Sequence, residues 1–485
     1  MNINNKSLFK QQCYINGKWV SAESNETIEV NNPATNEVIG STPKLSTNET
    51  KHAIESAGKA LKDWKNKTAK ERSIILRNWY DLMLLNQNDL AHIMTIEQGK
   101  PLSESKGEIL YGSSFVEWFA EEGKRIYGDT IPEHQSDKRI IVIKQPVGVV
   151  AAITPWNFPN AMITRKCAPA LAAGCTVVVK PASMTPYSAL ALGELAEKAG
   201  IPPGVFNVIT GNAQEIGNEL SSNPIVKKLS FTGSTEVGKV LIRNCAGTVK
   251  KVSMELGGNA PFIVFNDANL DEAVNGAIMS KFRNTGQTCV CANRIYAQED
   301  IYDDFVRKLT NEVKKLKVGN GLEDGITQGP LINEQALEKV EEHLKDALSK
   351  GAKIEIGGKR HALSGTFFEP TVLSGVNKKM KVAEEETFGP LAPVFKFTDE
   401  QDVIEQANSS EFGLAAYFYA RDIGLIWRVA EKIESGIVGV NTGIISTEVA
   451  PFGGVKESGV GREGSKYGIE EFLEIKYICL GGIND

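Results

Sequence analysis

The sequence lacks the features that mark several large classes of protein. No apolar stretch approaches the ~20 residues that a membrane-spanning helix needs. The N-terminal segment MNINNKSLFKQQ is polar and has no apolar core of the kind found in signal peptides. The formal net charge is −6, and acidic and basic residues are mixed along the chain without a basic stripe. The sequence therefore predicts a cytoplasmic protein with neither a membrane nor a nucleic-acid partner.

Cysteine and histidine are sparse and irregularly placed. The seven cysteines stand at positions 13, 167, 175, 245, 289, 291 and 479. An odd number at such spacings is not a disulfide framework and fits a reducing compartment. The five histidines stand at positions 52, 92, 134, 343 and 361, and none neighbours a cysteine. This distribution argues against a zinc site, and no metal is predicted.

The chain does contain a regular alternation of strand-like and helix-like segments. At 485 residues it should form two or three domains. Strands are predicted at 147–153, 176–180, 205–209 and 228–231, with a helix at 185–199 and another after 232–238. This succession predicts an α/β fold with a doubly wound parallel sheet.

A second α/β unit is predicted after Glu255. Its strands are expected at 261–265 and 293–297, and its helices at 269–284, near 301–316 and at 333–350. In the last helix Leu337, Val340, Leu344 and Leu348 are expected to share one apolar face. Two further segments, 139–144 and 472–479, look like exposed strands, which predicts oligomerisation through sheet edges.

A thiol, a carboxylate and an amide stand out as candidate catalytic groups. Cys289 lies in residues 286–291 (GQTCVC), Glu255 in 254–259 (MELGGN) and Asn157 in 155–159 (PWNFP). A thiol reacts as the thiolate and needs a base or a positive neighbour. With no histidine nearby, these groups favour acyl chemistry on an aldehyde over a protease. Taken singly, Cys289 would more often be a buried thiol, and Glu255 a solvated carboxylate.

Two segments are candidates for cofactor contacts. Residues 180–183 (KPAS) follow a predicted strand, and ligands of such sheets bind at the carboxyl ends of strands, so a phosphate or ribose contact is expected there. A simple loop before a helix is the alternative. Residues 233–238 (GSTEVG) lack the Gly-x-Gly-x-x-Gly spacing and are weak evidence on their own.

Taken together, these motifs resemble the NAD(P)-dependent aldehyde dehydrogenase superfamily over nearly the whole chain. Matching segments include 14–19 (YINGKW), 32–35 (NPAT) and 451–462 (PFGGVKESGVGR). The greatest similarity is to the succinate-semialdehyde dehydrogenases, carried by 281–284 (KFRN), 286–294 (GQTCVCANR) and 441–446 (NTGIIS).

The resemblance implies an aldehyde dehydrogenase-like fold. A Rossmann-like cofactor domain is expected from residues 1–122 and 146–254, a catalytic domain from 255–468, and a small bridging β element for oligomerisation from 123–145 and 469–485. It also implies a homodimer or homotetramer.

The resemblance further implies the chemistry. Cys289 attacks the aldehyde, the Asn157 amide and the Cys289 backbone N–H hold the oxyanion, hydride passes to the nicotinamide, and Glu255 activates the water that hydrolyses the thioester. Cofactor contacts are implied for the following residues: Trp156, Asn157, Lys180, Pro181, Ala182, Ser183, Gly233, Ser234, Leu256 and Glu386. Because Ser183 replaces the glutamate of many NAD-using relatives, NADP should be preferred, with NAD also accepted.

The substrate's far carboxylate is expected to bind Arg165, Arg283 and Ser446, although ordinary ion pairs would also explain the arginines. Succinate semialdehyde is the expected substrate, and glutarate semialdehyde or another ω-carboxylated aldehyde is the alternative. A coenzyme-A-acylating relative would lack Glu255, and a non-catalytic one would have lost the thiol or the amide. Cys291 is a candidate redox partner of Cys289 or, equally, a packing residue.

Overall fold

The cofactor-side lobe is built on an eight-stranded sheet. The computed structural model describes residues 3–483. The strand order is β2-β1-β9-β8-β7-β10-β11-β21, and the five strands from β9 to β11 run parallel. The strands are β1 (Cys13–Ile15), β2 (Lys18–Val20), β7 (Val149–Ile153), β8 (Thr176–Lys180), β9 (Phe206–Val208), β10 (Val226–Thr232), β11 (Lys251–Glu255) and β21 (Gly459–Val460).

Helices cover both faces of this sheet, which explains the continuous apolar runs in its strands. In β8, Val177 and Val179 pack into one core, while Val178 packs into the core on the opposite face. The helices are α1 (Thr47–Asn66), α2 (Ala69–Leu85), α3 (Gln87–Gln98), α4 (Leu102–Glu122), α5 (Ala161–Ala173), α6 (Tyr187–Lys198), α7 (Ala213–Ser222) and α8 (Thr235–Ala246). The predicted doubly wound sheet is confirmed.

The second lobe is built on a seven-stranded sheet in the order β14-β15-β16-β13-β12-β18-β19, parallel except for β14. Its strands are β12 (Ala260–Val264), β13 (Ala292–Gln298), β14 (Lys353–Ile356), β15 (Thr371–Val376), β16 (Leu391–Phe397), β18 (Ala415–Tyr419) and β19 (Ile437–Val440). Its longer helices are α9 (Leu270–Lys281), α10 (Tyr302–Val313), α11 (Glu334–Ser349), α13 (Glu400–Asn408) and α14 (Ile423–Lys432).

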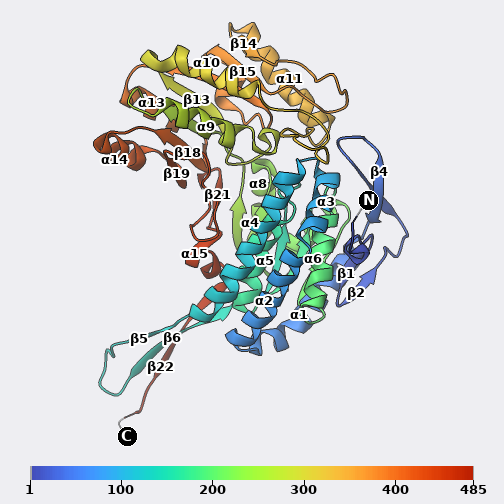
Figure 1. Ribbon diagram of the computed structural model, residues 1–485. Coiled ribbons are helices and arrows are strands. Elements are labelled where there is room, and N and C mark those ends of the chain that lie inside the picture. Colours follow the sequence, from blue (N-terminus) through green and yellow to red (C-terminus); the bar gives the residue numbers. More distant parts are fainter. Residues whose placement is uncertain (1–2, 484–485) are drawn as a thin grey trace.

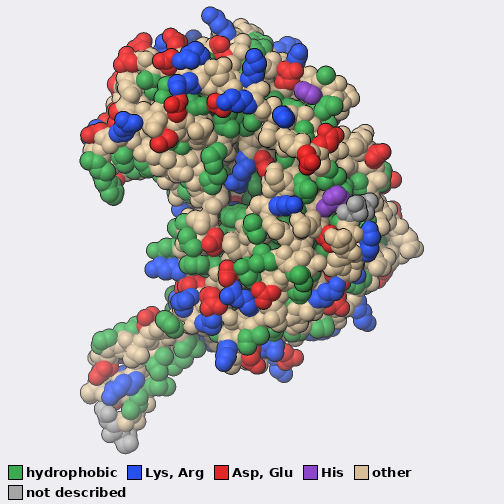
Figure 2. All heavy atoms as spheres, viewed as in Figure 1, with side chains coloured by type: hydrophobic (Ala, Val, Ile, Leu, Met, Phe, Trp, Pro, Cys, Tyr) green, Lys and Arg blue, Asp and Glu red, His purple; other side chains and the backbone are tan. Residues whose placement is uncertain are grey.

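The two segments that fitted neither lobe pair with each other. β5 (Asp129–Ile131), β6 (Arg139–Pro146) and β22 (Leu473–Leu480) form a sheet in the order β22-β6-β5 that projects from the body (Figure 1). Apolar side chains lie along this arm (Figure 2), including Ile475, which is 70% exposed, and Tyr477, which is 59% exposed.

The remaining elements are short. They are η1 (Lys6–Leu8), β3 (Thr27–Asn31), β4 (Val38–Pro43), η2 (Gly123–Arg125), η3 (Arg283–Gly286), η4 (Glu299–Ile301), α12 (Lys381–Glu384), β17 (Phe412–Gly413), β20 (Val455–Lys456) and α15 (Ser465–Glu470). Within residues 3–483, no helix combines the length and apolar character needed to cross a bilayer.

Two details of the predicted second unit are wrong. The helix expected at 269–284 ends at Lys281, because Asn284 and Thr285 take left-handed backbone angles (φ 50° and 56°) that no α-helix accommodates. Leu348 was assigned to the apolar face of α11, but it is 39% exposed. It lies one residue before the helix ends at Ser349, beyond the core that covers the preceding turns.

Candidate active site

The carboxyl ends of the parallel strands bring the predicted site residues together. Asn157 follows β7, Gly233 follows β10, and Glu255 is the last residue of β11. From the second lobe, Cys289 precedes β13 and Glu386 follows α12. A cavity of about 690 Å³ is lined by residues of both lobes. Its lining includes these predicted residues: Trp156, Asn157, Gly233, Ser234, Leu256, Cys289 and Glu386.

The Cys289 thiol lies on the wall of this cavity and is partly exposed. Burial raises its pKa to about 12, the charges of Glu386 and Glu255 raise it further, and Arg165 opposes them. The resting group is therefore the thiol, and attack on a substrate requires its proton to be removed. A Cβ at Gly258 would stand 2.5 Å from the Cys289 carbonyl oxygen, so glycine is needed there for the nucleophile's backbone to approach β12.

The Asn157 side chain points its amide toward the nucleophile's loop. Its Nδ2 donates to the carbonyl oxygen of Gln287 at 3.1 Å, two residues before Cys289. The Asn157 backbone carbonyl accepts hydrogen bonds from Lys100 and Asn284. The amide is thus held beside the thiol, where an oxyanion donor is needed.

Glu255 is buried, and its Oε2 has no hydrogen-bond partner among the described residues. Burial raises the pKa of this carboxyl well above its usual range, and Glu463 raises it further, while Arg165 and Lys166 lower it. A carboxyl with a raised pKa and a free oxygen suits the role of general base near neutral pH.

The predicted cofactor residues include an unpaired buried cation. The Lys180 ammonium at the end of β8 has no ion-pair or hydrogen-bond partner within residues 3–483, and burial lowers its pKa to about 8. A buried, unpartnered cation fits an anionic or hydroxyl-bearing ligand. Glu386 accepts a hydrogen bond from the Gly258 N–H at 3.3 Å, and burial raises its pKa to about 7.

The other cofactor candidates surround these two groups. The Trp156 ring meets Phe388 edge-on, with 5.6 Å between the centroids. Pro181 and Ala182 continue from Lys180. Ser183 lines an adjoining cavity of about 630 Å³ that also touches Met184.

The predicted carboxylate-binding residues converge on a residue that the sequence analysis missed. Tyr111 is a phenol on α4, and its hydroxyl contacts Ser446. Burial raises the pKa of Tyr111, and the charges of Arg165 and Arg283 oppose that rise. Arg283 stacks over Phe158 at 4.9 Å, and no carboxylate within residues 3–483 pairs with it. No signal in the sequence marked Tyr111, because it stands in the middle of a long helix.

Arg165 is differently placed, because it forms a buried ion pair with Glu463. Its guanidinium also lies over the Phe452 ring at 4.0 Å. Glu463 was missed as well, although it directly follows the family-like segment 451–462. The second thiol, Cys291, is buried and donates to the Lys281 carbonyl at 3.1 Å.

The arrangement defines an oxidoreductase-type site in which a thiol, an amide and a carboxyl face a nucleotide-sized cleft between two α/β lobes. The aldehyde dehydrogenase family profile matches residues 19–478, and the chain belongs to that family.

Close relatives come from several bacteria. The chain is 67% identical over 483 residues to a glutarate-semialdehyde dehydrogenase of Pseudomonas aeruginosa, covering 100% of both chains. It is 65% identical over 481 residues to the succinate-semialdehyde dehydrogenase (NADP+) GabD of Escherichia coli, covering 99% of this chain and 100% of that one. The solved structure of an E. coli NADP-dependent enzyme is similar with a TM-score of 0.99, 65% identity, and coverage of 99% of this chain and 100% of that chain.

Proposed function

We propose that this aldehyde dehydrogenase oxidises succinate semialdehyde to succinate with reduction of NAD(P)+. The observation that carries the proposal is the Arg283 guanidinium, which has no carboxylate partner within residues 3–483 yet lowers the pKa of the Cys289 thiol by its nearby charge. A free cation beside the nucleophile suits an aldehyde with a carboxylate at its far end. Arg165 and Ser446 complete this carboxylate site, and Tyr111 is added to it.

In the acylation step, the Cys289 sulfur bonds to the aldehyde carbon. The carbonyl oxygen gains negative charge and receives hydrogen bonds from the Asn157 amide and the Cys289 backbone N–H. One such donor is typically worth ~10²–10³ in rate. When bound, NAD(P)+ supplies the hydride acceptor, and Cys289 is left as a thioester.

In the deacylation step, Glu255 takes a proton from water, which attacks the thioester carbon. The carbon–sulfur bond breaks, the acid leaves, and Cys289 regains its proton. Lys180 and Glu386 would hold the cofactor's riboses, and the cavity-lining Trp156, Gly233, Ser234 and Leu256 would contact the rest of it.

The direct test separates these two half-reactions. Cys289→Ala should abolish all hydride transfer. Glu255→Gln should give one burst of reduced cofactor, equal to the enzyme concentration, and then stop. A Cys289→Ala protein with full activity would refute the assignment, and loss of the burst in Glu255→Gln would show that Glu255 also forms the thiolate.

Glutarate semialdehyde is the second candidate substrate, favoured by the 67% identical relative of that name. It is one methylene longer, and one methylene in a pocket is worth only ~1–3 kcal/mol. Measuring kcat/KM for four-carbon and five-carbon semialdehydes, with an uncharged aldehyde for comparison, separates the two proposals. The higher value identifies the substrate.

We further infer that NADP is preferred over NAD. Ser183 brings no negative charge to the cofactor site, and the free Lys180 ammonium is three residues away in sequence. A 2′-phosphate therefore meets no repulsion there and finds a cation to pair with. A relative at 65% identity carries NADP+ in its name.

The proposed domains are the predicted ones: a cofactor domain (1–122 and 146–254), a catalytic domain (255–468) and an oligomerisation element (123–145 and 469–485). Residues 1–2 and 484–485 lie outside the described part of the chain. β21, from the catalytic segment, joins the edge of the cofactor sheet. The exposed Ile475 and Tyr477 on β22 support assembly through this arm into a homodimer or homotetramer. Light scattering of Ile475→Lys, compared with the unaltered protein, tests it.

A further inference from the structure

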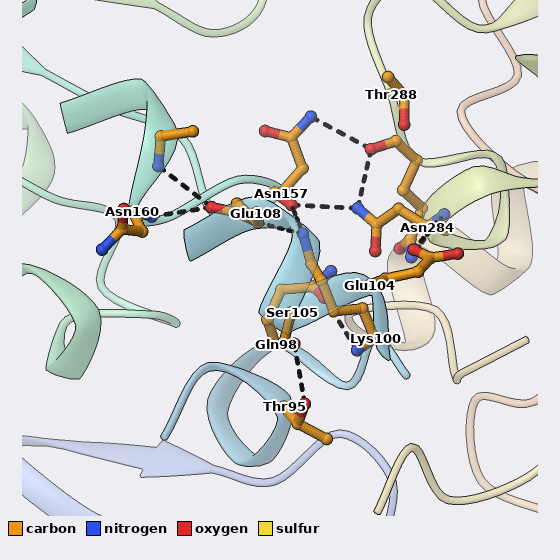
Figure 3. A network of polar contacts seen from close by, with 12 residues as sticks. Thr95, Gln98, Lys100, Glu104, Ser105, Glu108, Asn157, Asn160, Asn284 and Thr288 are labelled. Atoms are coloured by element: carbon orange, nitrogen blue, oxygen red, sulfur yellow. Dashed lines mark hydrogen bonds and ion pairs between the residues drawn. The ribbon is translucent and has the colours of Figure 1, made fainter. Parts of the chain in front are cut away.

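The backbone carbonyl of Asn157 is held by hydrogen bonds from two different lobes. Lys100 Nζ donates to it at 2.7 Å, and Asn284 Nδ2 donates to it at 3.1 Å (Figure 3). Lys100 lies just before α4 of the cofactor lobe, whereas Asn284 belongs to η3, which leads to Cys289. The same peptide whose side chain faces the nucleophile's loop is therefore fixed from both sides.

Lys100 is itself rigidly placed. Its ammonium pairs with Glu108 Oε2 at 2.5 Å and lies over the Phe158 ring at 4.0 Å. The side chain is only 1% exposed, so no water competes for it. The other oxygen of Glu108 accepts from the backbone N–H groups of Asn160 at 2.9 Å and Ala161 at 3.2 Å. The Lys100–Glu108 pair thus holds the whole turn from 157 to 161.

Asn284 connects this turn to the nucleophile. Besides the Asn157 carbonyl, its Nδ2 contacts the Gln287 carbonyl at 3.2 Å, the same oxygen that accepts from Asn157 Nδ2. Its backbone N–H donates to Glu104 Oε2 at 2.8 Å. Asn284 holds a left-handed φ of 50° in order to make these contacts. Such backbone strain persists only where surrounding contacts over-determine it.

The main chain of Lys100 is also pressed against the catalytic lobe. A Cβ at Gly321 would stand 2.5 Å from the Lys100 carbonyl oxygen, and one at Gly329 would stand 2.2 Å from the Gly99 oxygen. Gly99 itself has a φ of +94°. The lysine therefore sits at a close-packed junction of the two lobes, where small displacements are resisted.

We propose that Lys100 is a positioning residue for acylation: with Asn284, it fixes the Asn157 peptide so that the side-chain amide meets the developing oxyanion. This rests on the proposed role of Asn157. An oxyanion donor acts through preorganisation, so a donor free to shift by even ~1 Å loses much of its effect. Removing Lys100 should slow acylation without weakening cofactor binding.

The experiment compares Lys100→Met with Lys228→Met in the full-length protein. Lys228 is a matched control, because it is equally buried, pairs with Glu471 at 3.2 Å and lies 5.2 Å from the Phe472 ring, away from the cavity lining. Single-turnover formation of reduced cofactor should slow by ~10–100-fold in Lys100→Met and by less than ~3-fold in Lys228→Met. Equal slowing in both would overturn the proposal, as would an unchanged rate in Lys100→Met.

A double-substitution cycle then asks whether Lys100 acts through Asn157. In an Asn157→Ala background, Lys100→Met should slow the single turnover by less than ~3-fold further, because there is no amide left to aim. Multiplicative losses would overturn the positioning role. If Asn157→Ala alone leaves the rate unchanged, the proposed function itself fails, which is a separate result.

Asn284→Gly provides an independent arm should Lys100→Met not fold. Glycine accepts the positive φ and keeps the N–H that binds Glu104, so only the side-chain contacts are lost. Thr285→Gly is its control, because Thr285 has a φ of 56° but its hydroxyl donates to the Gly329 carbonyl, away from Asn157. We expect a slower single turnover, with unchanged cofactor affinity, in Asn284→Gly only. Equal rates in the two glycine variants would overturn the proposal.

Discussion

Arg165 and Glu463 form a buried ion pair through a single carboxylate oxygen. Glu463 Oε2 lies 2.6 Å from Arg165 Nη2 and 2.8 Å from Nε, and its Oε1 is taken by Lys166. Arg165 is therefore already partly committed within the protein, whereas Arg283 has no carboxylate partner in the described part of the chain. The two arginines assigned to the substrate should consequently respond differently to substitution.

Arg283→Ala should raise KM for succinate semialdehyde by about 10–100-fold, because a charge-assisted hydrogen bond contributes ~1.5–3 kcal/mol. The KM for butanal, which lacks the carboxylate, should change by less than ~3-fold. The melting temperature should stay the same, since no internal ion pair is broken. Steady-state kinetics and thermal unfolding measure these effects, and equal losses on both aldehydes would contradict the assignment.

Arg165→Ala should instead reduce stability as well as raise KM. It leaves Glu463 paired only with Lys166, and breaking a buried pair costs ~3–5 kcal/mol. We expect a lower midpoint in denaturant unfolding, together with a larger KM effect on succinate semialdehyde than on butanal. A variant of wild-type stability would show that the ion pair contributes little to folding.

The raised pKa of Glu255 predicts a pH dependence of stability. In the folded protein this carboxyl keeps its proton above ~4.3, the ordinary pKa at which the unfolded chain loses it. Between the two pKa values the folded state binds more protons, so stability should fall as pH rises through that window. Glu255→Gln removes this titration and should gain stability relative to wild type as pH rises. A difference in melting temperature that stays constant from pH 5 to 8 would contradict this.

Ser183→Glu should shift cofactor preference toward NAD by at least ~10-fold in the ratio of kcat/KM values, because the new carboxylate repels a 2′-phosphate and accepts from a 2′-hydroxyl. Ser183→Ala is the control, since it removes the hydroxyl without adding charge and should still favour NADP. An unaltered enzyme that works only with NAD would end this interpretation.

Cys291 should protect Cys289 during oxidation. Peroxide converts Cys289 to the sulfenic acid, and the Cys291 thiol then displaces water from it to give a disulfide that a dithiol reduces. Cys291 must first release its hydrogen bond to the Lys281 carbonyl. Cys291→Ala should retain activity but not recover after peroxide and dithiothreitol. Cys479→Ala, which removes an exposed thiol, should recover like wild type. Full recovery of Cys291→Ala would leave that residue a packing role only.

Local sequence patterns predicted most of the fold, because they depend on neighbouring residues. The apolar run of β8 (Thr176–Lys180) matches the predicted strand residue for residue, since a strand covered on both faces is apolar throughout. The end of α9 was missed, because the left-handed backbone of Asn284 is imposed by contacts with Glu104 and Asn157, which are distant in sequence.

The sequence by itself also identified the thiol, the base and the amide, since their motifs are carried by consecutive residues. Only the tertiary structure decided which groups surround them. Lys100 precedes Asn157 by 57 positions, and Glu463 follows Arg165 by 298, yet each pair is in hydrogen-bond contact. Such pairings depend on how two lobes pack together, and no local pattern records that packing.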